Sequence, residues 1–479
     1  MASTITLTMV DGVRIVVPNS LNLITPYVLM EQEDWFEDEI KFLRRMLQPG
    51  QQVIDIGANY GAYTLSMANA VGPTGRVWAF EPASSTARFL ADGITANGFP
   101  HVVLEQIALS STCGTARLSL NVNSEMNSLV HNVAPGSASE IVPLSTLDEC
   151  MSRQGWRDIE FMKIDAEGEE ANILKGGTRF FAQLSPLVQY EIKAGTALHL
   201  ELVHLFSELG YESYRLVPGL DMLVPFDARA TADGYLLNLF CCKRDRAQQL
   251  ARRGVLMSHA SLRSTTAAER LKAARATIRN RGEYDWGSTI ARMPYGARLA
   301  GLWKQRVADG ESRDVCAALC LYALSRDSSM RPMDRFVALE ASSNLLQGVC
   351  ARQPSCLRRS SLARAARDYG ARSVAANALG TLAKAILQHN QLDPGEPFLA
   401  PGERFDAIPP GDVIGDWVLA GVLEEYERLG SYSSFYTGNS ALQRLELIQR
   451  IGFGSPEMER RLRLLQRRFH LTSSYLDAS

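Results

Sequence analysis

A short run near residue 55 constrains the fold of this chain more than any other part of the sequence. Residues 53–56 read VIDI, an apolar run typical of a strand buried inside a sheet, and residues 57–61 (GANYG) follow it with two glycines. Apolar residues at 63, 65 and 67 then indicate a helix. A buried strand, a glycine-bearing turn and a helix in this order form a βα unit whose turn admits a ligand next to the backbone.

The residues of this turn restrict which ligand fits. Gly57 lets a ligand approach the backbone, and Gly61 allows the helix to pack tightly on the strand. A dinucleotide-binding loop reads Gly-x-Gly-x-x-Gly, but Asn59 and Ala62 replace its second and third glycines here. The turn therefore favours a ligand without a pyrophosphate, and Asp55 can face a cationic group on it. S-adenosylmethionine has these properties, because it carries an amino acid end with an ammonium group, a cationic sulfonium and an adenosine but no phosphate.

A second acid follows the next predicted strand. Residues 76–80 (RVWAF) lead directly into Glu81 and Pro82. A carboxylate at the end of this strand accepts hydrogen bonds from the two ribose hydroxyls of a nucleotide, and it would repel the ribose phosphate of NADP. NAD stays compatible with Glu81 taken alone.

The first half of the chain has the pattern of an α/β domain with a Rossmann-like parallel sheet. Residues 5–17 alternate between apolar and polar around Asp11-Gly12, which predicts a hairpin in front of the sheet. A polar stretch at 121–139 is expected to form a loop or lid over the acceptor. The last strand follows a turn-rich stretch and is expected to be antiparallel. We therefore predict one domain over 1–244, with strands at 52–56, 76–80, 102–108, 161–164, 187–192 and 236–242.

The second half lacks strand signals. Residues 245–310 are rich in arginine, alanine and serine and are interpreted as a connector with one helix. Residues 311–479 are predicted to form an all-α domain, and the stretch 364–382 resembles a tetratricopeptide helical hairpin, although no clean repeat period is found. Its helices are expected at 315–325, 334–349, 357–369, 373–389, 412–429, 440–451 and 456–469.

Composition excludes several function classes. The net charge is −2, which gives no strong attraction to nucleic acid or anionic lipid. No secretory signal and no apolar stretch of about 18 residues is found, so we expect no membrane insertion and a cytoplasmic location. The eight cysteines form no Cys-x-x-Cys unit, and Cys316 and Cys320, one helical turn apart, are interpreted as buried thiols rather than metal ligands.

With these residues in place, the chain resembles the FkbM family of S-adenosylmethionine-dependent methyltransferases over about residues 35–243. The resemblance rests on 53–61, 80–82, Ala108 with Gly114, Leu147-Asp148, 163–168 (KIDAEG), Glu170 and 174–177 (LKGG). It implies a class I methyltransferase fold and methyl transfer to a hydroxyl oxygen of a sugar, glycan or natural product, and it does not cover the helical half. The expected cofactor-binding residues are Asp55, Gly57, Ala58, Asn59, Gly61, Glu81, Pro82 and Ala108.

Three carboxylates are expected to carry the chemistry. Asp165 and Glu167 follow the strand at 161–164, and Glu191 ends the strand at 187–192, on the sheet edge where ligands bind in open α/β folds. Methyl transfer needs a group that removes the hydroxyl proton, and Asp165 is the favoured base. Glu167 either orients the substrate or caps the next helix. Asp165 and Glu191 could also share a magnesium ion. His131 is a less favoured alternative base.

Two other functions compete with this prediction. In the methyltransferase prediction, the helical half recruits a carrier or glycan substrate or holds the enzyme in an oligomer. A scaffold would instead use the helical half to bind a protein partner and would keep S-adenosylmethionine binding as a regulatory or vestigial feature. The intact acids at 55, 81, 165 and 167 argue against such decay. A nicotinamide-dependent oxidoreductase would need the missing glycines and a correctly placed Tyr-x-x-x-Lys unit, which the sequence lacks.

Overall fold

The computed structural model describes residues 3–260, 292–308, 313–352, 356–389 and 392–470, except 122, 131–137, 195, 196 and 199; it also describes 266, 269, 270, 272, 273, 276 and 290. The chain divides into two compact units. The α/β unit comprises Met1–Leu216, Leu223–Ala232 and Leu236–Ser258. The helical unit comprises Val217–Met222, Asp233–Tyr235 and His259–Ser479. Each is described by itself.

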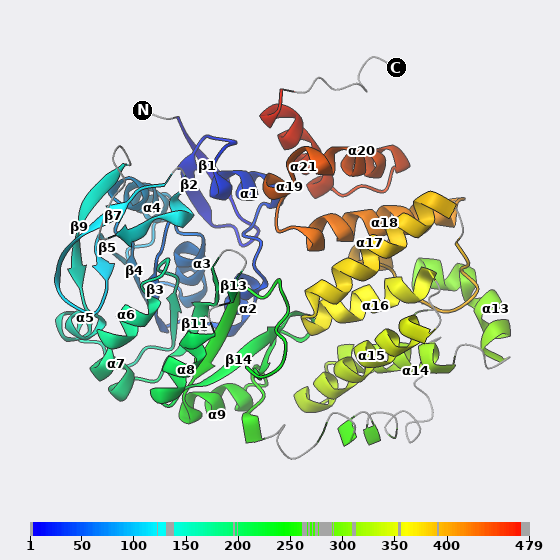
Figure 1. Ribbon diagram of the computed structural model, residues 1–479, viewed down its shortest axis with the longest axis horizontal. Coiled ribbons are helices and arrows are strands. Elements are labelled where there is room, and N and C mark those ends of the chain that lie inside the picture. Colours follow the sequence, from blue (N-terminus) through cyan, green and yellow to red (C-terminus); the bar gives the residue numbers. More distant parts are fainter. Residues whose placement is uncertain are drawn as a thin grey trace. The chain divides into compact units, whose positions relative to one another are not determined.

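A mixed eight-stranded sheet forms the centre of the α/β unit (Figure 1). β3, β4, β5, β10 and β11 are parallel, and β16 runs antiparallel to both β11 and β14. The expected antiparallel last strand is therefore confirmed. In spatial order the strands are β15 (Met222–Pro225), β14 (Glu212–Val217), β16 (Asn238–Cys242), β11 (Leu187–Glu191), β10 (Phe161–Ile164), β3 (Gln52–Ile56), β4 (Arg76–Phe80) and β5 (Val102–Glu105).

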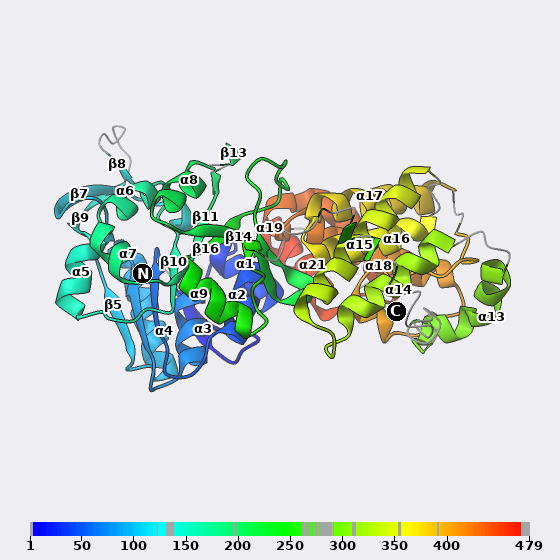
Figure 2. The same ribbon diagram turned by 90° about the horizontal axis from the view of Figure 1, so that it is seen from below.

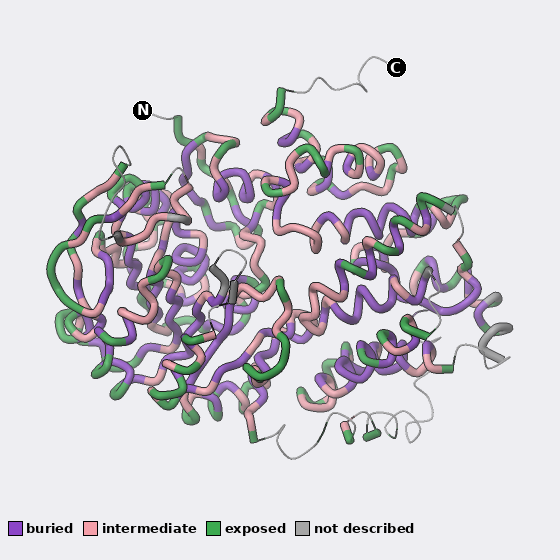
Figure 3. Tube along the Cα trace, in the orientation of Figure 1, coloured by how far each residue is buried: buried purple, intermediate pink, exposed green. Residues whose placement is uncertain are grey.

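Helices cover both faces of this sheet, and each face has its own apolar core (Figures 2 and 3). Because β3 is buried on both sides, Val53 belongs to one core and Ile54 to the other. One face packs against α2 (Asp38–Met46), α3 (Ala62–Val71), α4 (Ser84–Asn97), α9 (Arg244–Arg252) and the hairpin of β1 (Thr4–Thr8) and β2 (Arg14–Pro18). The other packs against α5 (Leu147–Gln154), α6 (Glu170–Lys175), α7 (Thr178–Gln183) and α8 (Glu201–Glu208).

A second, four-stranded sheet was not predicted. The strand expected at 102–108 is divided into β5 and β6, and the expected polar loop at 121–139 contains a strand. The sheet comprises β6 (Ala108–Leu109), β9 (Ser139–Ser145), β7 (Gly114–Ser119) and β8 (Ser128–Val130). β6 and β8 have only two and three residues, and β7 and β9 mix polar with apolar residues, so these strands lack the apolar runs and the strict alternation that identify a strand in a sequence.

The helical unit is built from helices that pack mainly on their neighbours in sequence. Its C-terminal region is helical, as predicted. Asp233 also belongs to this unit, where it accepts hydrogen bonds from the backbone N–H and hydroxyl of Ser373 at the start of α17. The principal helices are α13 (Pro294–Ala308), α14 (Arg313–Arg326), α15 (Pro332–Arg352), α16 (Cys356–Tyr369), α17 (Arg372–His389), α18 (Ile414–Gly430), α20 (Leu442–Ile451) and α21 (Pro456–Arg468). Among the described residues, no helix is long and apolar enough to span a membrane.

Helix α18 contains three buried glutamates, each paired with arginines from other parts of the helical unit. Their relative exposures are 0–3%. A buried carboxylate is tolerated only when a cation and hydrogen bonds replace its hydration. The pairs are Glu424–Arg404 (2.9 Å), Glu425–Arg367 (3.3 Å) and Glu427–Arg461 (3.4 Å).

We expect Glu427→Ala to destabilise the helical unit by about 3 kcal/mol, because it removes the buried carboxylate that pairs with both Arg444 and Arg461. Arg461 is 1% exposed and then keeps its contact with Glu457 at 2.9 Å. Urea unfolding followed by far-ultraviolet circular dichroism measures the change. Glu459→Ala is the matched control on α21, because its contact with Arg463 is 3.9 Å long and exposed; it should cost at most about 1 kcal/mol. Equal unfolding midpoints for both variants would contradict the structural role of the buried pairs.

Candidate functional site

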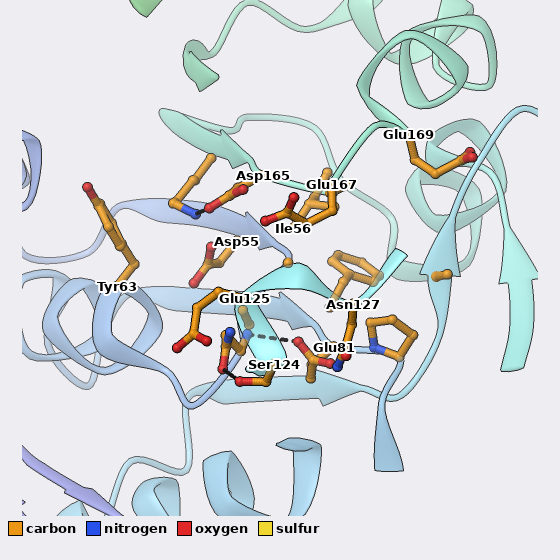
Figure 4. Close-up of a pocket in the computed structure, with 18 of the residues that line it drawn as sticks. Asp55, Ile56, Tyr63, Glu81, Ser124, Glu125, Asn127, Asp165, Glu167 and Glu169 are labelled. Atoms are coloured by element: carbon orange, nitrogen blue, oxygen red, sulfur yellow. Dashed lines mark hydrogen bonds and ion pairs between the residues drawn. The ribbon is translucent and has the colours of Figure 1, made fainter. Parts of the chain in front are cut away.

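A pocket opens at the carboxyl edge of the main sheet, where β3, β4 and β10 end (Figure 4). It holds about 1020 Å³ of space free of protein atoms, part of it open to solvent. Parallel strands place their carboxyl ends on one edge, so residues far apart in sequence meet there. The acids that line it are Glu37, Asp55, Glu81, Glu125, Asp165, Glu167 and Glu169, and the lysine that lines it is Lys163.

The turn after β3 is held between the turns that follow its two neighbouring strands. Gly57 and Ala58 both donate their backbone N–H to the carbonyl oxygen of Phe80, at 3.0 Å. Gly57 has φ +80°, and a Cβ on it would lie 1.7 Å from the carbonyl oxygen of Asp165. Glycine is therefore required here because the β10 turn approaches so closely, whether or not a ligand lies next to the backbone. Gly61, with φ +93°, begins α3 and lies against Leu90 of α4.

Glu81 is held in place by the backbone around it. Its Oε2 accepts the N–H of Asn59 at 2.8 Å, and its Oε1 accepts the N–H of Ala83 at 2.9 Å. The side chain is only 6% exposed, and burial raises the pKa of Glu81 to about 7. Each carboxylate oxygen can accept a second hydrogen bond, so a diol could still bind to Glu81.

Asp55 is fully buried at the end of β3. Its Oδ2 accepts the hydroxyl of Thr64 at 2.5 Å, whereas its Oδ1 has no hydrogen-bond partner. Burial raises the pKa of Asp55, and the nearby charge of Lys163 lowers it. Lys163 lies opposite Asp55 on β10, with its Nζ 2.6 Å from Asp165 Oδ2 and 4.9 Å from the ring centroid of Tyr63.

Asp165, Glu167 and Glu191 form one carboxylate cluster. One oxygen of each lies within 4.8 Å of the others. Burial and then repulsion from Asp165 raise the pKa of Glu167 to about 8. Burial followed by repulsion from Asp165 and Glu167 raises the pKa of Glu191 to about 9. Near neutral pH the cluster therefore holds protons unless a cation binds to it.

Residues 123–127, which we call the roof segment, cover the pocket (Figure 4). The segment contains the 3-10 helix η1 (Ser124–Met126). The hydroxyl of Ser124 donates to Asn59 Oδ1 at 3.0 Å, which fastens the roof to the turn after β3. Glu125 Oε1 accepts the N–H of Thr25 at 3.1 Å, near the start of α1 (Ile24–Gln32). The roof is thus attached on two sides of the pocket.

The structure brings most of the predicted site residues together. Gly61 and Glu191 are not among the lining residues, although Glu191 belongs to the carboxylate cluster, and His131 lies outside the described residues. The roof segment lies within the polar stretch at 121–139, which was expected to form a loop or lid over the acceptor. The lining residues Thr25, Trp35 and Glu37 were not predicted from sequence, because they come from segments without a motif. The predicted residues that line the pocket are Asp55, Gly57, Ala58, Asn59, Glu81, Pro82, Ala108, Asp165 and Glu167.

Replacing Glu191 should change how stability depends on pH. The pKa of Glu191 is raised from an ordinary value of 4.5 to about 9, so its contribution to stability is lost as pH rises between these values. The glutamine of Glu191→Gln cannot titrate. The melting temperature of this variant relative to that of wild type should therefore increase as the pH rises from 5 to 9. Glu201→Gln, at an exposed position on α8, should show no such gain. A gain that is constant with pH would contradict the coupling within the cluster.

The same variants test the magnesium alternative. If magnesium binds to the three carboxylates, adding it near pH 9 should raise the melting temperature of wild type but not of Glu191→Gln. An equal response of both proteins would exclude Glu191 as a ligand.

Comparison with known proteins gives a family match that contains most of the pocket lining, apart from Thr25, Trp35 and Glu37. Residues 55–213 match the family model described as the methyltransferase FkbM domain. Solved structures with some similarity include an FkbM methyltransferase from Methylobacillus flagellatus (15% identity, 40% of this chain and 43% of that chain, TM-score 0.28). They also include a SAM-dependent O-methyltransferase from Thermotoga maritima (16% identity, 50% of this chain and 77% of that chain, TM-score 0.25). A third is a SAM-dependent methyltransferase from Aquifex aeolicus (14% identity, 45% of this chain and 93% of that chain, TM-score 0.25).

No curated protein matches the chain. TM-scores this low add no argument about function, and the family match leaves the helical unit uncovered. The match is narrower than the predicted range of 35–243, but it contains both strand-end acids and the carboxylate cluster. At residues 55–213, this chain carries a methyltransferase domain of the FkbM family.

Proposed function

We propose that the protein is an S-adenosylmethionine-dependent O-methyltransferase that acts on a hydroxyl of a sugar, glycan or natural product. The observation that carries this proposal is the pocket itself, in which two buried strand-end acids and two further carboxylates line one space. Asp55 and Glu81 suit a cofactor with a cationic end and a ribose, and Asp165 and Glu167 suit an acceptor that must lose a proton.

The residues of the pocket fit S-adenosylmethionine. Asp55 has a buried oxygen without a partner, which a ligand's cationic group can satisfy. Glu81 is fixed by two backbone N–H groups and can accept the ribose hydroxyls. Gly57, Ala58 and Asn59 form the turn between these acids, and Pro82 and Ala108 complete the lining. When bound, the cofactor supplies the methyl group as a sulfonium, which reacts by in-line displacement.

The proton of the acceptor hydroxyl is proposed to pass to the pair of carboxylates after β10. Asp165 keeps its position through the ion pair with Lys163. Glu167 has a pKa of about 8, near the value that an effective base needs at neutral pH. Glu191 lies within 4.8 Å of the pair, and its raised pKa of about 9 keeps it protonated near neutral pH, so it can donate a hydrogen bond to either carboxylate.

A carbohydrate acceptor is proposed because carboxylates accept several hydroxyl hydrogen bonds at once. The lining contains acids and amides at its polar end and few cations. A polyhydroxylated acceptor can donate to these groups, whereas an anionic acceptor would be repelled. A nucleic-acid acceptor is disfavoured for the same reason.

Cofactor binding is tested by calorimetric titration of the full chain with S-adenosylmethionine and, separately, with NAD. We expect micromolar binding of S-adenosylmethionine only, weakened about tenfold in Asp55→Asn and in Glu81→Gln. Glu105→Gln is the matched control, because Glu105 ends the neighbouring strand β5 and contacts Arg153 and Gln154 outside the pocket lining. Tighter binding of NAD, or no binding of either cofactor, would contradict the proposal.

Proton transfer is tested with Asp165→Asn and Glu167→Gln, using release of S-adenosylhomocysteine with a panel of glycan acceptors. Each variant should lower kcat by about 10²-fold or more while its Kd for S-adenosylmethionine stays within about threefold of wild type. Asp158→Asn is the control, because this exposed acid precedes the opposite end of β10 and pairs with Arg246 at 3.6 Å. Unchanged kcat in both variants would exclude these carboxylates as the base.

The helical unit is proposed to recruit the acceptor or a protein partner, or to join two copies of the chain. Its tetratricopeptide-like character and the cytoplasmic location of the protein stay predictions from the sequence. One experimental result distinguishes the scaffold alternative from the methyltransferase. A scaffold would bind S-adenosylmethionine without releasing S-adenosylhomocysteine with any acceptor.

A further inference from the structure

Two buried carboxylate oxygens that belong to pocket-lining residues lack a hydrogen-bond partner within the described part of the chain. One is Asp55 Oδ1, on the floor of the pocket at the end of β3. The other is Glu125 Oε2, in the roof segment. A buried acceptor without a partner costs about 1–3 kcal/mol, so both oxygens indicate a missing donor.

The two oxygens of Glu125 face different surroundings. Oε1 accepts the N–H and the hydroxyl of Thr25, which fixes the side chain at the start of α1. Asn123 Oδ1 accepts the N–H of Ile24 at 3.2 Å and adds a second attachment of the roof to the same helix end. With Oε1 occupied in this way, Oε2 is the oxygen left for a ligand.

The charges near Glu125 show which kind of donor fits. Burial raises the pKa of Glu125, and the negative charge of Asp165 raises it further. Glu125 in turn raises the pKa of Glu167. The roof therefore adds one more acid to a pocket that contains one lysine, and Lys163 is already paired with Asp165. A cationic donor satisfies such a group better than a hydroxyl or an amide does.

We propose that Glu125 is a cofactor-binding residue whose Oε2 accepts a hydrogen bond from the α-ammonium group of S-adenosylmethionine, opposite Asp55. This inference rests on the proposed function, because it assigns a group of the same cofactor. It gives the roof segment a role in recognition, since the side chain that fastens the roof to α1 also contacts the ligand.

Calorimetric titration of the full chain with three ligands tests this assignment. S-adenosylmethionine and S-adenosylhomocysteine both carry the α-ammonium group, whereas 5′-methylthioadenosine lacks the amino acid end. Glu125→Gln should weaken binding of the first two about tenfold and leave 5′-methylthioadenosine within about twofold of wild type.

Two further variants separate recognition from folding. Glu140→Gln is the matched control, because Glu140 of β9 accepts the N–H of Ser84 at the start of α4, outside the pocket lining. It should leave all three affinities within about twofold of wild type. Asn123→Ala removes the other attachment of the roof to α1 without changing a lining residue, so it should change the three affinities by less than about threefold.

Other outcomes would overturn the assignment. Equal weakening of all three ligands, or the same loss in Asn123→Ala, would mean that Glu125 only holds the roof. Weakening of S-adenosylmethionine alone would place Glu125 at the sulfonium. Tighter binding in Glu125→Gln would mean that its carboxylate competes with the ligand. If wild type binds none of the ligands, the proposed function itself fails, whereas normal wild-type binding with an unaffected Glu125→Gln rejects only this inference.

Discussion

The arrangement of the pocket depends on the interaction of the buried ammonium group of Lys163 with the carboxylates around it. It is 5% exposed on a central strand, where burial by itself would lower its pKa. The carboxylates of Asp165, Asp55 and Glu37 instead raise the pKa of Lys163, so it stays charged. Breaking a buried pair leaves an uncompensated charge, so neither the lysine nor its acids can be replaced singly at low cost. The expected cofactor acid and the expected catalytic acid are thereby linked through one cation.

Backbone contacts reinforce this link. The carbonyl of Asp165 approaches Gly57 so closely that no side chain fits there, and the N–H of Asp165 donates to the carbonyl of Ile56 at 3.0 Å. A shift of the β10 turn would therefore move the β3 turn as well. The roof segment adds a third connection through Ser124 and Asn59. Several short contacts thus fix acids that would otherwise repel one another and move apart.

The helical unit also buries charged side chains, and there the opposite charges are paired and stabilise the fold. Its buried glutamates on α18 are each matched by arginines. Burial by itself lowers the pKa of Arg428, but the charges of Glu457 and Glu425 outweigh burial and raise that pKa. In the pocket, by contrast, the acids of the carboxylate cluster exceed the cations and their pKa values rise. Charge that is balanced suits a rigid core, whereas charge that is left unbalanced suits a site that takes up a proton or a cationic ligand.

The sequence by itself determined the main strands, the helical second half, the family match of residues 55–213 and most of the acids that line the pocket. These features are local, because a buried strand followed by a turn needs only adjacent residues to be recognised. The position of Glu191 on the same sheet edge as Asp165 was also expected from sequence, whereas only the tertiary structure decided that Glu37, Thr25 and Glu125 belong to the pocket. Glu125 is 100 residues from its partner Thr25, and no spacing rule connects positions that meet only after the sheet has formed.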